Sequence, residues 1–137
     1  MNAVIEMHDS ECVAIELHED GGGFVLLDAY VHRGDGEPLI GPHEGGMQRV
    51  RIKVDAMAIQ GTVGRLPAYI YEGSLVIGTS IQDNIVRFPA AYAVPVRLSM
   101  MLSDDARVVA VCGDGLSIEP EGAFRFVEPV DFSSQER

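Results

Sequence analysis

The chain of 137 residues has few basic side chains, because ten Lys and Arg stand against twenty-one Asp and Glu, and its formal net charge at pH 7 is −11. A surface of that sign repels phosphate backbones and anionic membrane surfaces, so we expect neither nucleic acid nor a membrane as a partner. The charge favours solubility, and it leaves a basic protein as a partner that electrostatics would attract.

Long apolar runs and a leader sequence are also missing. No run approaches the roughly 18 residues of a membrane-spanning helix, and the opening MNAVIEMHDSE lacks the basic and apolar regions of a signal peptide. We therefore expect a cytoplasmic protein. Two cysteines, Cys12 and Cys112, are too few for a disulfide framework. We expect both to be buried free thiols, because free cysteine packs as a small apolar residue.

Catalytic and cofactor signatures are absent. The sequence contains no G-x-S-x-G elbow, Walker loop or glycine-rich dinucleotide fingerprint, so we expect no cofactor. The histidines His8, His18, His32 and His43 show no H-x-x-x-H or H-x-H spacing. A zinc site could only be assembled by the fold, for instance from His32, His43 and Asp28. The sequence therefore predicts no metal, and it assigns no catalytic residue.

Helical periodicity is missing too, because Gly, Pro or β-branched residues interrupt every candidate window. What is present instead is alternation with a period of two, as in RVRIKVDAMAIQG and VPVRLSMML, separated by turn residues. We predict one all-β domain over residues 1–132, an antiparallel, hairpin-rich barrel or sandwich of about 8–10 strands. Residues 133–137 are expected to form a polar tail.

Several local features follow from this pattern. The pairs Asp104–Asp105 and Asp114–Gly115 are predicted to close hairpins, and AYIY and SLVIG are predicted as separate strands on either side of EGS. In VPVRLSMML, alternate residues from Val94 to Leu102 should point inward. Residues 33–48 hold five glycines and two prolines, which predicts a long loop that is functional or mobile.

The stretch RVRIK places Arg49, Arg51 and Lys53 on the wet side of its strand, where each should pair with an acidic residue across the sheet. The stretch FVLLDAYVH, residues 24–32, has one apolar side and one mixed side. It is joined to ECVAIELH by the glycine-rich EDGGG, so we predict a hairpin.

Symmetric pairing about that loop would set Cys12 opposite Tyr30, and Glu16 opposite Leu26. Glu16 and Asp28 would then lie on a diagonal, about 7–8 Å apart. The outer face of the hairpin, which would include Cys12, would be half apolar and half titratable. The inner face would be core and would pair Leu17 with Val25, Ile15 with Leu27 and Val13 with Ala29. The candidate ligand or partner surface comprises Glu16, His18, Asp28, Tyr30, His32 and His43.

Three functions fit these observations. The leading one is a non-enzymatic binding or interaction module that forms a homodimer, because catalytic motifs are missing and the outer face needs a cover. The second is a small-ligand carrier or enzyme with a site at the barrel mouth around Asp28, Tyr30 and His32, and with residues 33–48 as a lid. The third is an acidic, antitoxin-like protein that binds a basic partner.

The C-terminal stretch DARVVAVCGDGLSIEPEGAFRFVEPV contains a strand, an Asp-Gly turn and a G-x-x-R-x-V-E ending. In these features it resembles the closing hairpins of small bacterial all-β proteins of uncharacterised function. The resemblance covers roughly the last forty residues. It implies a β fold and a bacterial cytoplasmic setting, and it implies no activity and no site residue.

Overall fold

The computed structural model describes residues 2–103 and 107–132, so the predicted Asp104–Asp105 turn and the tail over 133–137 lie outside the described residues. All regular elements in the described part are strands. They are β1 (Asn2–Leu17), β2 (Gly23–Gly34), β3 (Pro42–Asp55), β4 (Ala58–Gly61), β5 (Ala68–Ile77), β6 (Ser80–Asp83), β7 (Ile85–Phe88), β8 (Ala90–Tyr92), β9 (Val96–Leu102), β10 (Arg107–Gly113), β11 (Gly115–Pro120) and β12 (Arg125–Asp131). In this part of the chain, no helix is long and apolar enough to cross a membrane.

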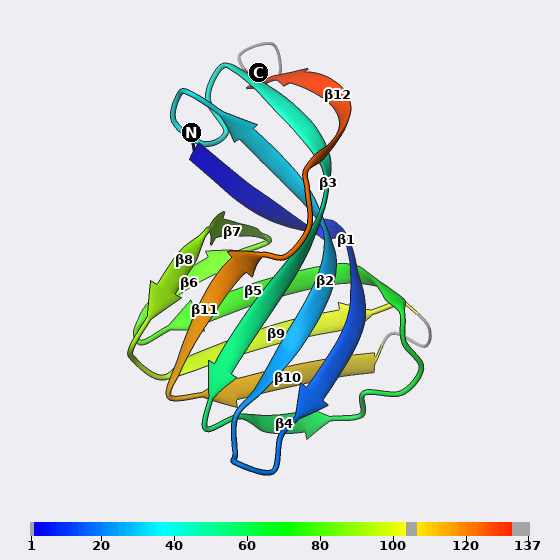
Figure 1. Cartoon of the computed structure of the whole chain (residues 1–137), viewed down its shortest axis with the longest axis vertical. Helices are drawn as coiled ribbons and strands as arrows, with labels where there is room; N and C mark the ends of the chain where they lie inside the picture. The colour runs from blue at the N-terminus through cyan, green and yellow to red at the C-terminus, as the bar shows by residue number, and fades with distance from the viewer. Residues whose placement is uncertain (1, 104–106, 133–137) are drawn as a thin grey trace.

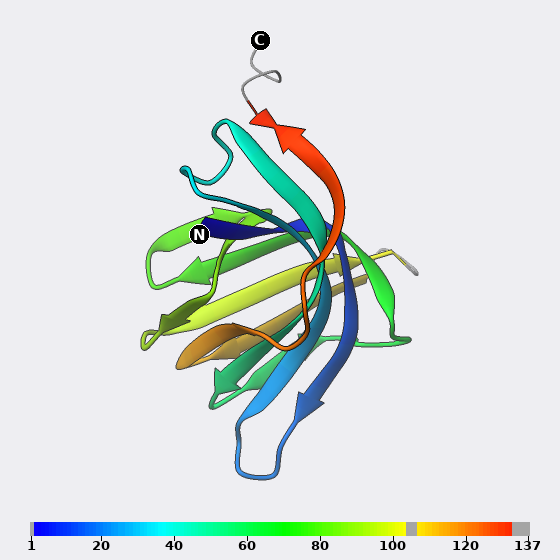
Figure 2. The same ribbon diagram turned by 45° about the horizontal axis from the view of Figure 1, so that its top comes forward.

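The strands form one antiparallel sheet that curls into a half-barrel (Figure 1). Its path runs β4-β10-β9-β5-β1-β2-β3-β11-β8, while β6 pairs with β5, β7 with β1 and β12 with β3. In both views β5, β9 and β10 cross behind β1, β2 and β3, so the curled sheet makes two layers (Figures 1 and 2). The all-β antiparallel prediction is confirmed. The described residues form twelve strands, more than predicted, because short strands such as β6 and β8 pair where the sequence shows only turns.

One apolar cluster fills the space between the two layers. β2 contributes Val25, Leu27 and Ala29, all fully buried, and β9 contributes alternate residues over 96–102, as the alternation predicted. Val94 was expected to point inward but precedes β9 and is 43% exposed. Each fully buried Val or Leu contributes about 1.5–3 kcal/mol to stability.

β1 and β2 form the predicted hairpin, but the register differs by two residues, with Glu16 opposite Phe24. A shift of two keeps each side chain on its predicted face. A bulge between Cys12 and Ala14 then reverses the faces along β1, and Cys12 points into the core with no exposed surface. The predicted outward position of Cys12 is therefore wrong. Leu17, predicted inward, is 53% exposed at the end of the strand.

Two other local predictions are wrong. AYIY and SLVIG form the single strand β5, which continues through Gly73, where a Cβ would come within 2.8 Å of the Met7 side chain. Asp114–Gly115 closes no hairpin, because β10 pairs with β9 and β4 whereas β11 pairs with β3 and β8. The Asp114 N–H donates to the Asp55 carbonyl oxygen at 2.9 Å. This dipeptide carries the chain from one layer of the sheet to the other.

The long loop predicted over 33–48 is much shorter, because only residues 35–41 connect β2 to β3. Two of the five glycines that suggested a loop, Gly45 and Gly46, lie in β3 for steric reasons. A Cβ on Gly45 would overlap the Tyr30 hydroxyl, and a Cβ on Gly46 would overlap the Arg125 carbonyl oxygen. Glycine at these positions lets the Tyr30 ring and β12 lie directly against β3.

The basic stripe on β3 pairs largely as predicted. Arg51 forms an ion pair with Glu121, and Lys53 Nζ lies 3.3 Å from a Glu119 carboxylate oxygen. The Arg51 guanidinium also lies 4.1 Å from the centre of the Phe24 ring. The lower outer face of the hairpin is therefore partly covered by side chains of its own sheet.

Candidate functional site

The six predicted site residues do not form one site. Glu16 and His18 lie at the free end of the hairpin, where both are exposed and their side chains are 3.2 Å apart. Asp28 lies midway along β2 opposite Glu11, so the predicted diagonal with Glu16 is wrong. Asp28 instead accepts a hydrogen bond from Arg125 of β12 at 2.9 Å.

The other three residues do come together, at the opposite end of the sheet. Tyr30 packs edge-on against His32, with ring centres 4.9 Å apart. His32 and His43 each lie edge-on against Phe132, at 5.2 and 5.4 Å. Both imidazoles are buried, and neither His32 Nδ1 nor His43 Nε2 has a hydrogen-bond partner among the described residues.

A hollow of about 610 Å³ opens beside Tyr30 and His32, between β1, β2 and β12. Leu39 from the 35–41 connection and Phe132 contribute its apolar walls. Among the described residues its lining contains four carboxylates and neither Lys nor Arg, and we call it the acidic hollow. Its polar members are Glu6, Asp9, Tyr30, His32, Glu128 and Asp131.

A wide bulge in β1 places the carboxylates of that strand. Glu6 pairs with Tyr30 and Glu11 pairs with Asp28, so residues 7–10 lie opposite a single residue of β2. The buried Ser10 stabilises this bulge through its hydroxyl, which donates to the Glu6 carbonyl oxygen at 2.7 Å and accepts the Tyr30 N–H at 2.9 Å.

Asn84, between β6 and β7, holds the bulge from the other side. Its carbonyl oxygen accepts the Met7 N–H and its side-chain oxygen accepts the His8 N–H, both at 2.8 Å. Asn84 itself adopts a φ of 63°, a left-handed conformation that Asn tolerates better than most residues. The two clamps fix where β1 departs from regular pairing.

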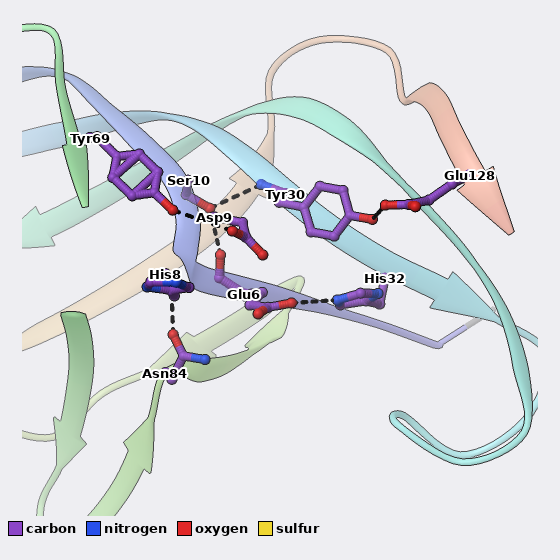
Figure 3. Close-up of polar contacts among 9 residues, drawn as sticks. All are labelled: Glu6, His8, Asp9, Ser10, Tyr30, His32, Tyr69, Asn84 and Glu128. Atoms are coloured by element: carbon purple, nitrogen blue, oxygen red, sulfur yellow. Dashed lines mark hydrogen bonds and ion pairs between the residues drawn. The ribbon is translucent and has the colours of Figure 1, made fainter. Parts of the chain in front are cut away.

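Two pairs of side chains line the floor of the acidic hollow (Figure 3). The Tyr30 hydroxyl donates to Glu128 Oε2 at 2.5 Å, and His32 Nε2 lies 2.8 Å from Glu6 Oε1. Burial, the hydrogen bond to Glu128 and the nearby negative charges raise the pKa of Tyr30. Tyr30 therefore stays protonated at neutral pH and donates its hydroxyl to Glu128.

Asp9 lies between Tyr69 and Tyr30 in Figure 3, and it accepts a hydrogen bond from the Tyr69 hydroxyl at 3.3 Å. Burial and the Asp9 charge raise the pKa of Tyr69, followed by smaller contributions that include the Glu6 charge. The donors that reach Glu6, Asp9 and Glu128 are thus two phenols and one imidazole, and none is a permanently charged base.

The arrangement does not suit a single metal ion. Within residues 2–103 and 107–132, no three His, Cys, Asp or Glu side chains are grouped closely enough to hold one. Carboxylates spread around a hollow suit an ammonium or guanidinium group, whose several N–H donors reach separate oxygens. The ring of Tyr30 in the lining adds cation–π attraction for the same group.

Sequence reasoning missed Glu6, Asp9 and Glu128. The stretch EMHDSE does carry a signal, since its run of polar residues breaks the alternation on both sides. In comparisons with known proteins, no family model, no curated protein and no solved structure matches the chain. The function is therefore interpreted from the geometry of the site.

Proposed function

We propose that the protein is a non-enzymatic binding module whose acidic hollow takes a cationic group of a basic partner protein. The observation that carries the proposal is the described lining, in which Glu6, Asp9 and Glu128 lie around the space and are contacted by two phenols and one imidazole. This proposal combines two functions predicted from the sequence, the non-enzymatic binding module and the acidic protein that binds a basic partner.

Charge on a larger scale supports the same partner. The net charge of −11 attracts a basic protein over distances of about 10 Å at moderate salt. The nearest base on β12, Arg125, is paired with Asp28, and Arg33 is paired with Glu44 at 3.1 Å. These pairs leave the negative potential of Glu6 and Asp9 available to an incoming cation.

The enzyme alternative has less support from the contacts. A carboxylate such as Glu6 can orient a histidine that acts as a general base. In His32, however, Nδ1, the nitrogen that would face a substrate, is buried. Among the described residues, the Glu6 and His32 side chains form no hydrogen bond to a Ser, Thr or Cys side chain that could act as a nucleophile, because Ser10 bonds to the backbone carbonyl of Glu6 and not to its side chain.

The proposed module is one domain over residues 1–132 and a sandwich rather than a closed barrel, because β4 and β8 end the strand order without pairing with each other. One apolar cluster, to which both layers contribute, supports the single-domain assignment. In this proposal a basic partner, and not a second copy of the chain, covers the outer face of the β1–β2 hairpin. The purified protein should therefore sediment as a monomer.

The test uses a hexalysine peptide as a defined cationic probe, titrated by calorimetry at about 50 mM salt. The variant Glu6→Gln/Asp9→Asn removes two charges from the acidic hollow without changing side-chain size. The control Glu19→Gln/Asp114→Asn removes two exposed charges from turns that do not line the hollow, so both variants have the same net charge. Circular dichroism establishes that both are folded.

We expect the hollow variant to bind hexalysine about tenfold more weakly than the native chain, and the control to stay within about twofold. Raising the salt to about 500 mM should weaken binding to the native chain, because screening acts on this attraction. Equal affinities of the two variants would show that the peptide follows net charge alone, and the proposal would then be wrong.

A further inference from the structure

A second hollow, of about 810 Å³, opens on the other side of the β1 bulge. Its floor crosses β5 and β9 at small residues, Gly73, Ser74 and Ser99, and its apolar rim includes Tyr71 and Val108. Those two rim residues are 50% and 52% exposed, so they are free to contact a partner. We call this space the apolar-rimmed hollow.

Only a narrow ridge separates the two hollows. His8 lines the apolar-rimmed hollow while the next residue, Asp9, lines the acidic hollow. Likewise Asn84 lines the first and Ile85 the second. The His8 N–H donates to Asn84 Oδ1 at 2.8 Å, so the two chain segments that form the ridge, β1 and the connection from β6 to β7, are bonded to each other (Figure 3).

Aromatic rings continue across the ridge. Tyr69 donates its hydroxyl to Asp9, and its ring lies edge-on against both His8 and Tyr71, with ring centres 6.0 Å apart in each pair. Tyr69 is 37% exposed, so these rings form an accessible path from one hollow to the other. Exposed tyrosines side by side are typical of surfaces that bind protein segments.

We infer that the partner is an extended, basic and amphipathic segment of a protein, which crosses this ridge. This inference rests on the proposed function and deepens it. A Lys or Arg of the segment lies in the acidic hollow, and an apolar side chain two or more residues away packs against Tyr71 and Val108. Glu72 and Asp83, the carboxylates of the apolar-rimmed hollow, attract the same positive charge, and within residues 2–103 and 107–132 neither Lys nor Arg lines that hollow.

Charge complementarity and the continuity of the two hollows favour a protein segment over a small amine as the occupant. A free polyamine uses the carboxylates alone, and it leaves the exposed Tyr71 and Val108 uncovered. An extended chain spans about 3.3 Å per residue and places alternate side chains on one side, so a segment of seven residues reaches both hollows.

The experiment compares two capped heptapeptides of equal length and charge. One has four Lys followed by three Leu, so that either face of the extended chain carries both kinds of side chain. The other has Gln in place of Leu. Each is titrated into the native chain and into three variants. The variant Tyr71→Ser/Val108→Thr removes the apolar rim, Ile81→Thr removes an equally exposed apolar side chain of β6 outside both hollows, and Glu6→Gln/Asp9→Asn alters the acidic hollow.

We expect the Leu peptide to bind the native chain about tenfold more tightly than the Gln peptide. This advantage should disappear in Tyr71→Ser/Val108→Thr and persist in Ile81→Thr. Equal binding of both peptides to the native chain, or an advantage that survives the loss of Tyr71 and Val108, would overturn the inference. If both peptides then still bind Glu6→Gln/Asp9→Asn more weakly than the native chain, the proposed function is supported and only the inference is wrong. If that variant weakens neither peptide, the proposed function fails as well.

Discussion

The lower half of β2, residues 24–29, and its upper half, residues 30–32, are buried in different ways although they belong to one strand. From Phe24 to Ala29 the residues alternate, with odd positions fully buried and even positions half-buried. From Tyr30 to His32 successive residues are all buried, on both faces of the strand. The lower half packs only one face, against the apolar core. The upper half also packs its outer face, against β12 and Phe132.

The comparison shows that burial alone does not distinguish core from site. In the lower half, burial is apolar and follows from transfer of side chains out of water. In the upper half, the buried groups are a phenol and an imidazole that need partners. Glu128 of β12 and Glu6 of the neighbouring β1 supply them. One strand therefore supports a stable core at one end and a polar binding surface at the other.

The largest expected effect is in the lower half. Leu27→Ala should destabilise the protein by about 2–5 kcal/mol, because Leu27 is fully buried and the cavity cannot fill with water. Its neighbour Leu26 lies on the half-buried outer face, and Leu26→Ala should cost only about 1 kcal/mol. Urea unfolding of the two variants measures the difference. Equal losses would mean that the outer face of the lower half is packed like the core.

A medium effect is expected where the upper half meets β3. Gly45→Ala should cost about 1–3 kcal/mol, because the added Cβ overlaps the Tyr30 hydroxyl. Gly36→Ala is the control, since its Cβ meets only the Ile40 carbonyl oxygen at 3.8 Å. In a Tyr30→Phe background the cost of Gly45→Ala should fall, because part of the overlap is removed. A cost that is unchanged in that background would contradict the steric explanation.

The smallest effect concerns charge at the ridge. The hydrogen bond to the Tyr71 carbonyl, opposed by desolvation and helped by the charges of Asp9, Glu6 and Glu72, raises the pKa of His8 above 6.5. A raised native pKa means that protonated His8 stabilises the fold below pH 6.5, and that this contribution is lost as the pH rises through the native pKa.

The stability difference between the native chain and His8→Gln should therefore be largest at about pH 5.5 and vanish towards about pH 8. Urea unfolding at several pH values provides the measurement. A difference that grows with pH would show that the neutral imidazole, and not its protonated form, is favoured in the folded chain.

Much of the lower half could be predicted from the sequence, because alternation reports the burial of one face directly. Val25, Leu27 and Ala29 were identified as core on that basis, and the structure confirms them. Even the wrong register did little harm there, since a shift of two residues preserves the faces.

The upper half could not be predicted in the same way, because its contacts depend on bulges and on long-range pairing. Cys12 was placed on the wrong face because the bulge beside it leaves no clear mark on the alternation. Glu128 reaches Tyr30 across ninety-eight positions of sequence, and only the pairing of β12 with β3 brings it there. Gly45 suggested a flexible loop, whereas its role is to accommodate a ring from the neighbouring strand.

The open ends of the half-barrel bear on self-association. A sheet that does not close leaves edge strands, whose free N–H and C=O groups can add a strand from another molecule and start aggregation. Here the two ends of the strand order are only four and three residues long, β4 and β8. The longer outer strand β12 contains Pro129, which lacks an N–H to offer. An extended segment that binds this protein therefore has little backbone to pair with, and its side chains must supply most of the recognition.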